Sequence, residues 1–474
     1  MVTQSDSDDR VQDDKPMPDD DTPKREKKLS PSAQAIIRFV KSFEEGATID
    51  VLTEDADYSR LRQIVTSYRG SLYVSLMKRL EQVFKLGGVE IITQRDVMSL
   101  ITQLWEDNIS TLSMTELTFL EAIVQNPGNS LKDLSIKANQ SYAQSRRAQK
   151  RLFDSGVLKI GGMLNVDQMG LERVLIVLEN PSLVLSGPYC QKSLFIDDND
   201  GLPLVLTVAT VPFSRRKEFL DIVRSLRNTS TNIKLYGLSA GYPNFNSIYS
   251  DSQKGWKALD IFHFRLMLRK GSDPITISGI PTPSISETTR IKKSDTLVMD
   301  ALIESLDGTA NDIVRSTKLS QSTAFRKRAA LLNDGIILPR ARVNIPQLSD
   351  RIVVICSPEV GGNIRPGWQT LPLTYMSQIS NLEDKSDKKM LFLAALPTGF
   401  GKSVLDVIDD ETSKVDDYSA WIVDAAIGGT TKVSPMYDRR QNAWVWDVSQ
   451  HFDALTYSVV RSDASPYDIP LDLA

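Results

Sequence analysis

Apolar residues recur at helical spacing in two stretches of the chain that align with each other without a gap. Residues 117–125 of the first stretch align with residues 296–304 of the second, an offset of 179 positions. The first stretch places four apolar residues at i, i+1, i+4 and i+5: Phe119, Leu120, Ile123 and Val124. That spacing gives a helix one buried stripe. The pattern therefore predicts a duplicated helical element.

Each stretch predicts three short helices followed by a β-hairpin. Residues that cap or end helices stand at equivalent positions in the two copies: Ser130 and Thr309, Ser141 and Ser320, Gly156 and Gly335. The third helix of each copy is basic, reading SYAQSRRAQKRLFDSGVL from Ser141 and SQSTAFRKRAALLNDGII from Ser320. This order of elements is that of a winged helix-turn-helix.

A set of strand and helix patterns follows each helical stretch. The predicted strands are 173–178, 192–196, 204–211 and 233–240 in the first copy, and 351–356, 370–377, 390–396 and 420–426 in the second. A helix precedes the last strand of each set, at 214–226 and 400–410. These patterns predict a mostly antiparallel, ferredoxin-like α+β domain after each winged helix.

The fold class is thus α+β, with both domains duplicated and with further segments outside the repeats. An acidic, disordered tail is predicted for residues 1–29, because its apolar residues are too few to form a core. Helical patterns near 33–43, 58–84 and 95–105 predict an N-terminal helical region over 30–111. The predicted domains are winged helix-turn-helix segments at 112–166 and 292–345, α+β domains at 167–270 and 346–474, and a Pro-, Ser- and Thr-rich linker at 271–291.

Composition limits where a nucleic acid could bind. The 474 residues carry a formal net charge of −4, so any DNA-binding surface must be local. The two cysteines, Cys190 and Cys356, cannot form a disulfide framework, which favours a reducing cytoplasm. The sequence has no apolar run long enough to span a bilayer, so no membrane partner is predicted.

In a helix-turn-helix the third helix lies in the major groove, where its polar face meets phosphates and base edges. The residues predicted to contact double-stranded DNA are Gln144, Ser145, Arg146, Arg147, Gln149, Lys150, Thr323, Arg326, Lys327, Arg328, Arg340 and Arg342. A basic helix face is more often simply solvated. The presence of the cap, turn and wing context in both copies favours DNA contact over solvation.

A third repeated element contains both histidines of the chain. Tyr249, Trp256, His263 and Phe264 have the same spacing as Tyr437, Trp444, His451 and Phe452. Two histidines without clustered cysteines form no recognisable metal motif, so we expect packed aromatic residues and predict no cofactor or metal.

Residues 397–403, PTGFGKS, resemble the phosphate-binding motif of superfamily 2 helicases and lie between a predicted strand and a predicted helix. The aligned first copy, residues 212–223, has no glycine, and Leu396 stands where a complete Walker motif has glycine. Too few residues follow for a helicase core. We therefore expect no enzyme activity, and keep nucleotide hydrolysis as a minor alternative.

A winged helix-turn-helix followed by an α+β domain resembles the Lrp/AsnC-type transcription regulators of archaea and bacteria, over residues 112–269 and 292–460. The resemblance implies sequence-specific DNA binding, dimer formation through the α+β domain and control by a small effector. The chain departs from the family at 179–191, which is too short and too rich in Pro, Gly and Ser for the family's first helix.

The duplication suggests that one chain carries what is elsewhere a homodimer. We hypothesise that the two α+β halves pair about a pseudo-two-fold axis and set two recognition helices about 34 Å apart, one DNA turn. Self-association of the chain is a second way to reach the same geometry. The rival hypothesis is a protein-interaction scaffold, because winged helices also bind proteins.

Overall fold

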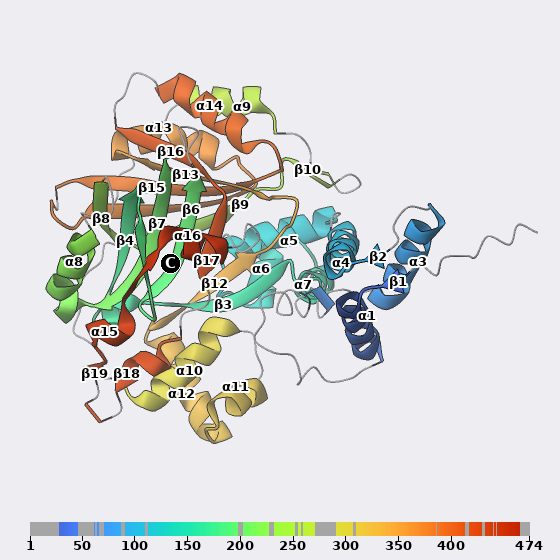
Figure 1. Ribbon diagram of the computed structural model, residues 1–474, viewed down its shortest axis with the longest axis horizontal. Helices are drawn as coiled ribbons and strands as arrows, with labels where there is room; N and C mark the ends of the chain where they lie inside the picture. Colours follow the sequence, from blue (N-terminus) through green and yellow to red (C-terminus); the bar gives the residue numbers. More distant parts are fainter. Residues whose placement is uncertain are drawn as a thin grey trace, which may run out of the picture. The chain divides into compact units, whose positions relative to one another are not determined.

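The structure is a computed structural model, and it describes the following residues: 28–45, 61, 64–65, 71–86, 91–109, 112–197, 202–226, 232–251, 255–256, 259–270, 291–306, 310–384, 386–412, 417–428, 432–438, 440–441 and 443–464. The chain forms two compact units (Figure 1). Among the described residues, one unit contains 28–45 and those between 71 and 101, and the other contains 61, 64–65 and those from 102 to 464. The predicted tail, apart from residues 28–29, and the predicted linker, apart from Ile291, lie outside the described residues.

The first unit is small and helical. Helix α1 (Pro31–Glu44) begins at Ser30, whose hydroxyl accepts a hydrogen bond from the amide of Ala33. Helix α3 (Leu72–Lys85) buries Leu72, Leu76 and Leu80, and the amide of Leu72 donates to Glu44 at 2.8 Å. Short strands β1 (Lys28–Leu29) and β2 (Ile91–Ile92) pair in parallel before α4 (Gln94–Ile109), which belongs to this unit as far as Ile101.

The second unit contains two groups of three helices that occupy the duplicated stretches. The first triplet consists of α5 (Met114–Gln125), α6 (Leu131–Lys137) and α7 (Tyr142–Asp154). The second triplet consists of α10 (Lys293–Glu304), α11 (Ala310–Thr317) and α12 (Gln321–Asn333). Left-handed residues end corresponding helices at equivalent positions, with φ of 51° at Asn139 and 57° at Lys318, and of 72° at Gly156 and 66° at Gly335.

The expected hairpins after the third helices are absent from the described residues at these positions. One strand follows each triplet, and the two strands pair with each other: β3 (Leu158–Leu164) runs antiparallel to β12 (Ile337–Val343). We call this pair the shared ribbon. Gly161 pairs with its own equivalent, Arg340, so the register is symmetric about that pair. The two triplets are therefore joined across a pseudo-two-fold axis.

Hydrogen bonds at the two ends of the shared ribbon repeat this symmetry. The amide of Asn165 donates to the carbonyl of Ile336 at 2.9 Å, and the equivalent amide of Asn344 donates to the carbonyl of Val157 at 2.8 Å. Each end of each strand is thus fixed to the other copy. An isolated two-stranded ribbon is only marginally stable, so the helices packed on it contribute the rest of its stability.

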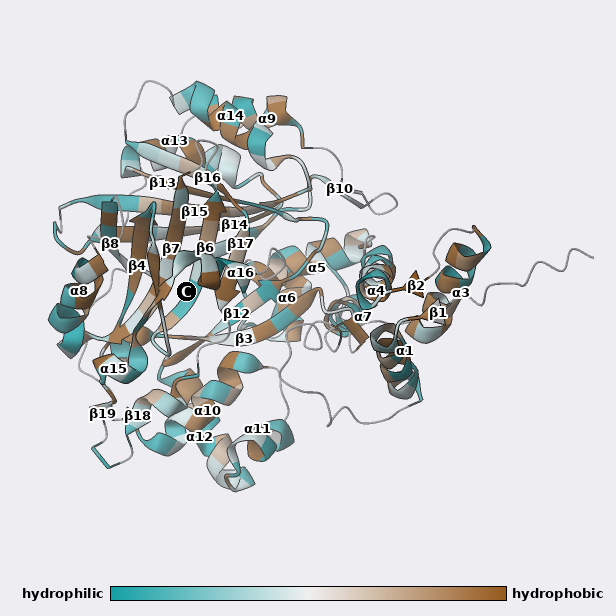
Figure 2. Ribbon diagram, in the orientation of Figure 1, coloured by the Kyte–Doolittle hydropathy of each residue, from teal (hydrophilic) through white to brown (hydrophobic). Residues whose placement is uncertain are grey.

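One sheet contains the strands of both α+β regions. The first half supplies β4 (Leu171–Glu179), β6 (Cys190–Asp197), β7 (Pro203–Pro212) and β8 (Asn232–Leu238), and the second supplies β13 (Asp350–Cys356), β14 (Leu373–Asn381), β15 (Lys388–Leu396), β16 (Tyr418–Val423) and β17 (Ala425–Gly428). These nine strands cover the eight predicted ones, because β16 and β17 together occupy the single strand predicted at 420–426. Their order, β16-β13-β15-β14-β8-β4-β7-β6-β17, forms a nearly closed sheet. The strands are mostly hydrophobic, whereas helices α8 (Arg216–Ser225) and α14 (Gly401–Thr412) have two-sided colouring (Figure 2).

Two equivalent junctions join the halves. At one, β8 and the short strand β9 (Tyr242–Phe245) both pair with β14 of the other half. At the other, β16 bends at Asp424 and continues as β17, which pairs with β6. The inner face of the sheet is a single core to which both halves contribute, including Leu206, Tyr236, Val353 and Tyr375.

Helix α13 (Pro358–Trp368) was not predicted, because three glycines and a proline interrupt its sequence. Two of these glycines permit close packing. A Cβ at Gly361 would lie 2.9 Å from Met390, and one at Gly367 would lie 2.7 Å from Leu268. The first half has strand β5 (Leu183–Ser186) at the corresponding place. The sequence of 179–191 led us to expect that no helix would form there, but it did not predict a strand.

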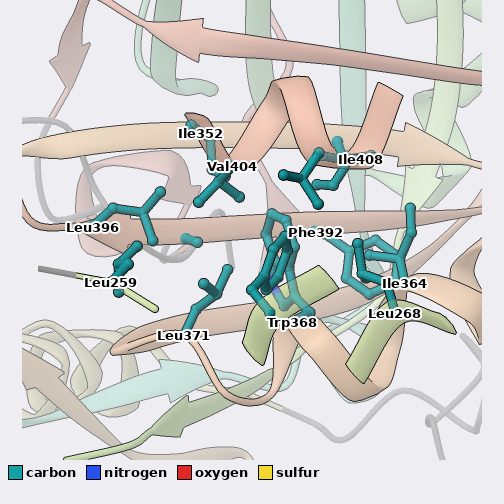
Figure 3. Close-up of a cluster of buried hydrophobic side chains, with 14 of the residues drawn as sticks. Leu259, Leu268, Ile352, Ile364, Trp368, Leu371, Phe392, Leu396, Val404 and Ile408 are labelled. Carbon is teal, nitrogen blue, oxygen red and sulfur yellow. The ribbon is translucent and has the colours of Figure 1, made fainter. Parts of the chain in front are cut away.

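The segment after each half packs on the other half. Helix α9 (Ile261–Lys270) follows the first half, yet its Phe264 and Leu268 belong to a core cluster that also contains residues of α13 and α14 of the second half. Figure 3 shows Leu268 in this cluster. Conversely, α15 (Val448–His451) and β20 (Asp453–Thr456) follow the second half; β20 pairs with β5 and Phe452 contacts Phe219 of α8. This reciprocal exchange makes the halves one folding unit.

Shorter elements complete the described chain. Hairpins β10 (Ser250–Asp251) with β11 (Gly255–Trp256), and β18 (Tyr437–Asp438) with β19 (Ala443–Trp444), precede the exchanged segments, and α16 (Tyr457–Ser462) ends it. Of the helices that the structure describes, none is both long enough and apolar enough to cross a membrane.

Candidate nucleic-acid interface

Helix α7 presents the larger cationic face. Arg146, Arg147 and Lys150 are exposed, while Ala148 and Leu152 on the opposite side are buried. The helix begins with a capping box: Gln144 accepts from the amide of Ser141 at 3.0 Å, and Ser141 accepts from the amide of Gln144. Gln144 therefore has a structural role as well as an exposed position.

Two polar residues of α7 lie away from the exposed face. Ser145 is fully buried, and its hydroxyl donates to Gln140 at 3.2 Å, across the turn that connects α6 with α7. Gln149 is half-buried and faces a cavity between the triplets. Because Ser145 is buried, its side chain is not on a surface that could contact DNA. The sequence pattern included it because such a pattern does not distinguish a buried serine from an exposed one.

Helix α12 presents fewer free cations than its sequence suggested. Arg326 is exposed, but Lys327 forms an ion pair with Asp295 of α10, and Arg328 donates to the carbonyl of Leu306 at 3.0 Å. Thr323 accepts from the hydroxyl of the N-cap, Ser320. Of the four residues predicted for this helix, three are thus engaged within the protein.

One cation of each third helix connects it to the first helix of its own triplet. In the first triplet, Arg151 pairs with Glu116 at 3.0 Å, and the carboxylate of Glu116 also accepts from the amide of Ser113. In the second, Lys327 pairs with Asp295, the residue equivalent to Glu116. Each acidic residue caps one helix and binds another, which holds the third helix in orientation.

The two arginines predicted on the strand of the second copy differ in exposure. Arg340 is 5% exposed and lies at the centre of the shared ribbon, where it donates to the carbonyl of Gly241 at 3.0 Å and stacks over Tyr375. It joins the ribbon to the sheet and lies away from solvent, a position that argues against the predicted DNA contact. Arg342 is half-buried beside Gly161.

Acidic residues also fix each triplet to the segment that follows its α+β half. Glu121 of α5 accepts from the amide of Ser247 at 2.8 Å. The equivalent residue of α10, Asp300, accepts from the amides of Val433 and Ser434. Burial is the main effect on Asp300 and raises the pKa of its carboxyl above the usual value, while these hydrogen bonds act in the opposite direction.

The glycine-rich turn at 397–403 already holds an anionic group from the chain. The amides of Gly399 and Gly401 donate to one carboxylate oxygen of Asp350, at 2.9 and 2.8 Å. Two of the amides that would cradle a phosphate are therefore occupied by Asp350. Lys402 is exposed on the first turn of α14.

The two histidines have different surroundings despite their equivalent spacing. His451 is buried, its Nδ1 accepts from the amide of Asp447 at 3.0 Å, and its ring packs edge-on against Tyr189. His263 lies half-exposed on α9. Within the described chain, no group of three or more His, Cys, Asp or Glu side chains is arranged to hold a metal ion.

Comparison of the chain with protein-family models, characterised proteins and solved structures gives no match. A functional assignment must therefore be argued from the geometry of these elements alone.

Proposed function

We propose that the protein is a DNA-binding transcription regulator in which a single chain supplies both halves of a pseudo-symmetric reader. Each triplet would act as a helix-turn-helix, with α7 and α12 as recognition helices. The observation that supports the proposal is the shared ribbon, whose symmetric register relates the two third helices to each other by one pseudo-two-fold axis. A duplex has a local two-fold of its own, so this symmetry suits two half-sites.

The α+β regions support the same proposal. Within each half the strands follow the order fourth, first, third, second, namely β8-β4-β7-β6 and β16-β13-β15-β14, which fits a ferredoxin-like arrangement. Their edge-to-edge pairing inside one chain would replace the dimer interface of an Lrp/AsnC-type regulator. The proposed resemblance to these regulators concerns the order of the domains, a helix-turn-helix followed by an α+β domain.

The proposed contact residues fall into three groups. Arg146, Arg147, Lys150 and Arg326 would contact phosphates or bases directly, because they are exposed and project from third helices. Gln144 and Thr323 lie in the first turns of the two helices. They would make weaker contacts to DNA, because their side chains already form hydrogen bonds at the helix starts. Arg342, which is half-buried on β12, would contribute from the shared ribbon.

Fluorescence anisotropy with random-sequence duplexes at several salt concentrations tests the proposal. The test variant is Arg146→Glu/Arg147→Glu/Arg326→Glu. Its matched control is Lys217→Glu/Lys388→Glu/Lys402→Glu, which makes the same change in charge at exposed positions on the α+β regions. We expect salt-sensitive binding by the wild type and the control, and loss of binding in the test variant.

Equal binding by the two variants would mean that net charge, and not the third helices, governs the interaction. Absence of salt-sensitive binding in the wild type would contradict DNA binding. A strictly palindromic preferred site would contradict simultaneous use of both helices by one chain, because α7 and α12 expose different side chains.

A protein-interaction scaffold is the second candidate, and exposed apolar residues on the triplets favour it. Phe325, at the position equivalent to Arg146, is 48% exposed, and Ile136 on α6 is 69% exposed. Apolar side chains of this kind form the centres of protein interfaces. Binding to a partner that persists at high salt and is lost in Phe325→Ala and Ile136→Ala variants, without any DNA binding, would support the scaffold.

We place nucleotide hydrolysis last among the candidates. Asp350 presents a carboxylate to the same amides that a phosphate would use, so like charges would oppose each other. We therefore expect no ATPase activity in the wild type; if there is any, Lys402→Ala tests whether it depends on this turn. Activity that disappears in that variant but persists in Lys217→Ala would revive the enzyme hypothesis.

A further inference from the structure

A cavity of about 430 Å³ lies between the two triplets. Much of its lining consists of pseudo-symmetric pairs, one member from each copy: Gln149 with Arg328, Phe153 with Leu332, and Ile160 with Pro339. The shared ribbon supplies the last pair, and the C-terminal halves of α7 and α12 supply the other two. The cavity thus lies between the two third helices and near the pseudo-two-fold axis, with additional lining residues from the first triplet.

The walls of the cavity are apolar, apart from a few polar groups. Its volume lies in the range of pockets that bind small molecules. Apolar contacts come from both copies, and the polar side chains are those of Gln149, Arg328 and Asn129. Among the described residues that line it, none is acidic, so the cavity offers no carboxylate to pair with a ligand's ammonium group.

Arg328 gives the cavity a specific chemistry. Its guanidinium donates through Nη2 to the carbonyl of Leu306, but its Nε is buried and makes no hydrogen bond within the described part of the chain. A buried donor left without an acceptor is costly, and a carboxylate matches the geometry of the guanidinium edge. The equivalent position in the first copy is Gln149, so the positive charge stands on one side only.

The pairing of the copies is also incomplete at this place. The amide of Leu306 donates to the carbonyl of Ile160 at 2.9 Å, linking the second triplet to the first strand of the ribbon. The equivalent residue in the first copy is Pro127, which has no N–H to donate. One side of the cavity is therefore tied by a hydrogen bond that the other side lacks.

We propose that this cavity binds a small amphipathic carboxylate that has an apolar body and no ammonium group. The carboxylate pairs with Arg328, and the apolar body lies between Phe153, Leu332 and the ribbon. Because the ligand separates the C-terminal turns of α7 and α12, its binding alters the spacing of the two third helices. That consequence for DNA rests on the proposed function, whereas the binding itself does not.

Calorimetric titration of the full chain with octanoate tests the site. We expect saturable binding of one octanoate per chain, at least about tenfold weaker binding of octanol, which lacks the charge, and similarly weak binding of 2-aminooctanoate, which adds the ammonium group. Tight binding of 2-aminooctanoate would overturn the ligand class. Absence of octanoate binding would overturn the site.

Variants of the cavity distinguish octanoate binding at this site from octanoate binding elsewhere on the protein. Arg328→Gln should weaken octanoate binding at least about tenfold, and Arg328→Lys should retain part of it. Leu332→Trp, which leaves Arg328 in place and puts a bulky indole where the apolar body of the ligand would lie, should weaken binding strongly. The matched control is Arg326→Gln, an exposed arginine on the same helix, which should bind octanoate as the wild type does. Equal binding by all four variants would overturn the proposal.

Anisotropy with DNA, with and without saturating octanoate, then tests the coupling. A shift in DNA affinity in the wild type that Leu332→Trp does not show would support it. Octanoate binding with the expected variant pattern, but no DNA binding at all, would leave the site standing and reject the proposed function. DNA binding that octanoate does not alter would reject the coupling alone.

Discussion

The two triplets share a backbone and differ in how they use their charges. Both have serine caps on the third helix, left-handed residues at Asn139 and Lys318, and an acidic residue that binds the third helix. On α7, three cations are exposed and Arg151 alone is tied to α5; on α12, Arg326 alone of the predicted cations is exposed. The positions that set the backbone are equivalent in the two copies, whereas the surface residues have diverged.

This difference suggests that the two triplets have different roles. The first triplet has the stronger electrostatic attraction to a phosphate backbone. The second directs Lys327 to Asp295 and Arg328 to the cavity near the pseudo-two-fold axis. A pseudo-symmetric chain can assign contact to one copy and regulation to the other, whereas a homodimer must use the same residues for both.

The largest expected effect comes from removing the exposed cations one triplet at a time. Arg146→Gln/Arg147→Gln/Lys150→Gln should lower the slope of log affinity against log salt concentration by about 3, and Arg326→Gln should lower it by about 1, because each phosphate contact contributes roughly 0.9. Anisotropy titrations across a salt series measure both slopes. Equal losses for the two variants would contradict the proposed difference in roles.

The ionic connections within the triplets should produce the next largest effect. Both partners of the Asp295–Lys327 pair are largely buried, with side chains 18% and 15% exposed, whereas Arg151 of the other pair is 39% exposed. Asp295→Asn should therefore cost about 2–3 kcal/mol in the local stability of α12, and Glu116→Gln less in α7. Hydrogen exchange of the two helices measures both values. A larger loss in α7 would reverse the predicted order.

Sequence patterns could predict what depends on neighbouring residues. The eight strands, the two helices before the last strands and the serine caps all follow from local periodicity and composition, and the structure contains them. The shared ribbon and the junctions of β14 with β8 and of β17 with β6 could not be predicted, because they join residues far apart in the chain. Local patterns contain no information about such pairing.

The candidate site was predictable in the same limited sense. The basic character of α7 and α12 is a local property, and it located the exposed arginines. The roles of Ser145 and Arg340 depend on partners at Gln140 and Gly241, and only the fold brings such partners together. Helix α13 shows the opposite effect, since its glycines oppose a helix locally but permit its close packing on Met390 and Leu268.

The two strands of the shared ribbon also differ in how closely they pack, because α10 lies close to Gly162 of β3. A Cβ at Gly162 would lie 2.6 Å from Ile337 and 3.0 Å from the carbonyl of Leu302, whereas the equivalent residue on the other strand is Ala341, which already carries a Cβ. Gly162→Ala should therefore cost about 1–2 kcal/mol, through overpacking. Denaturant unfolding measures the loss. The reciprocal change, Ala341→Gly, is the control, and a greater loss there would contradict the asymmetry.

The smallest expected effect concerns pH and the connection of α10 to residues 433–434. Burial raises the pKa of Asp300, so the folded protein binds this proton more readily than the unfolded chain does. Its contribution to stability is therefore fully present below the ordinary pKa of aspartate and is lost as the pH rises through the raised value. Asp300→Asn keeps the acceptor oxygen but does not titrate. The stability of the wild type relative to this variant, from denaturant unfolding, should rise as the pH falls from 7 to 4. A difference that stays constant or falls would show that the amides of Val433 and Ser434 outweigh burial, and that the carboxylate is held in its charged form.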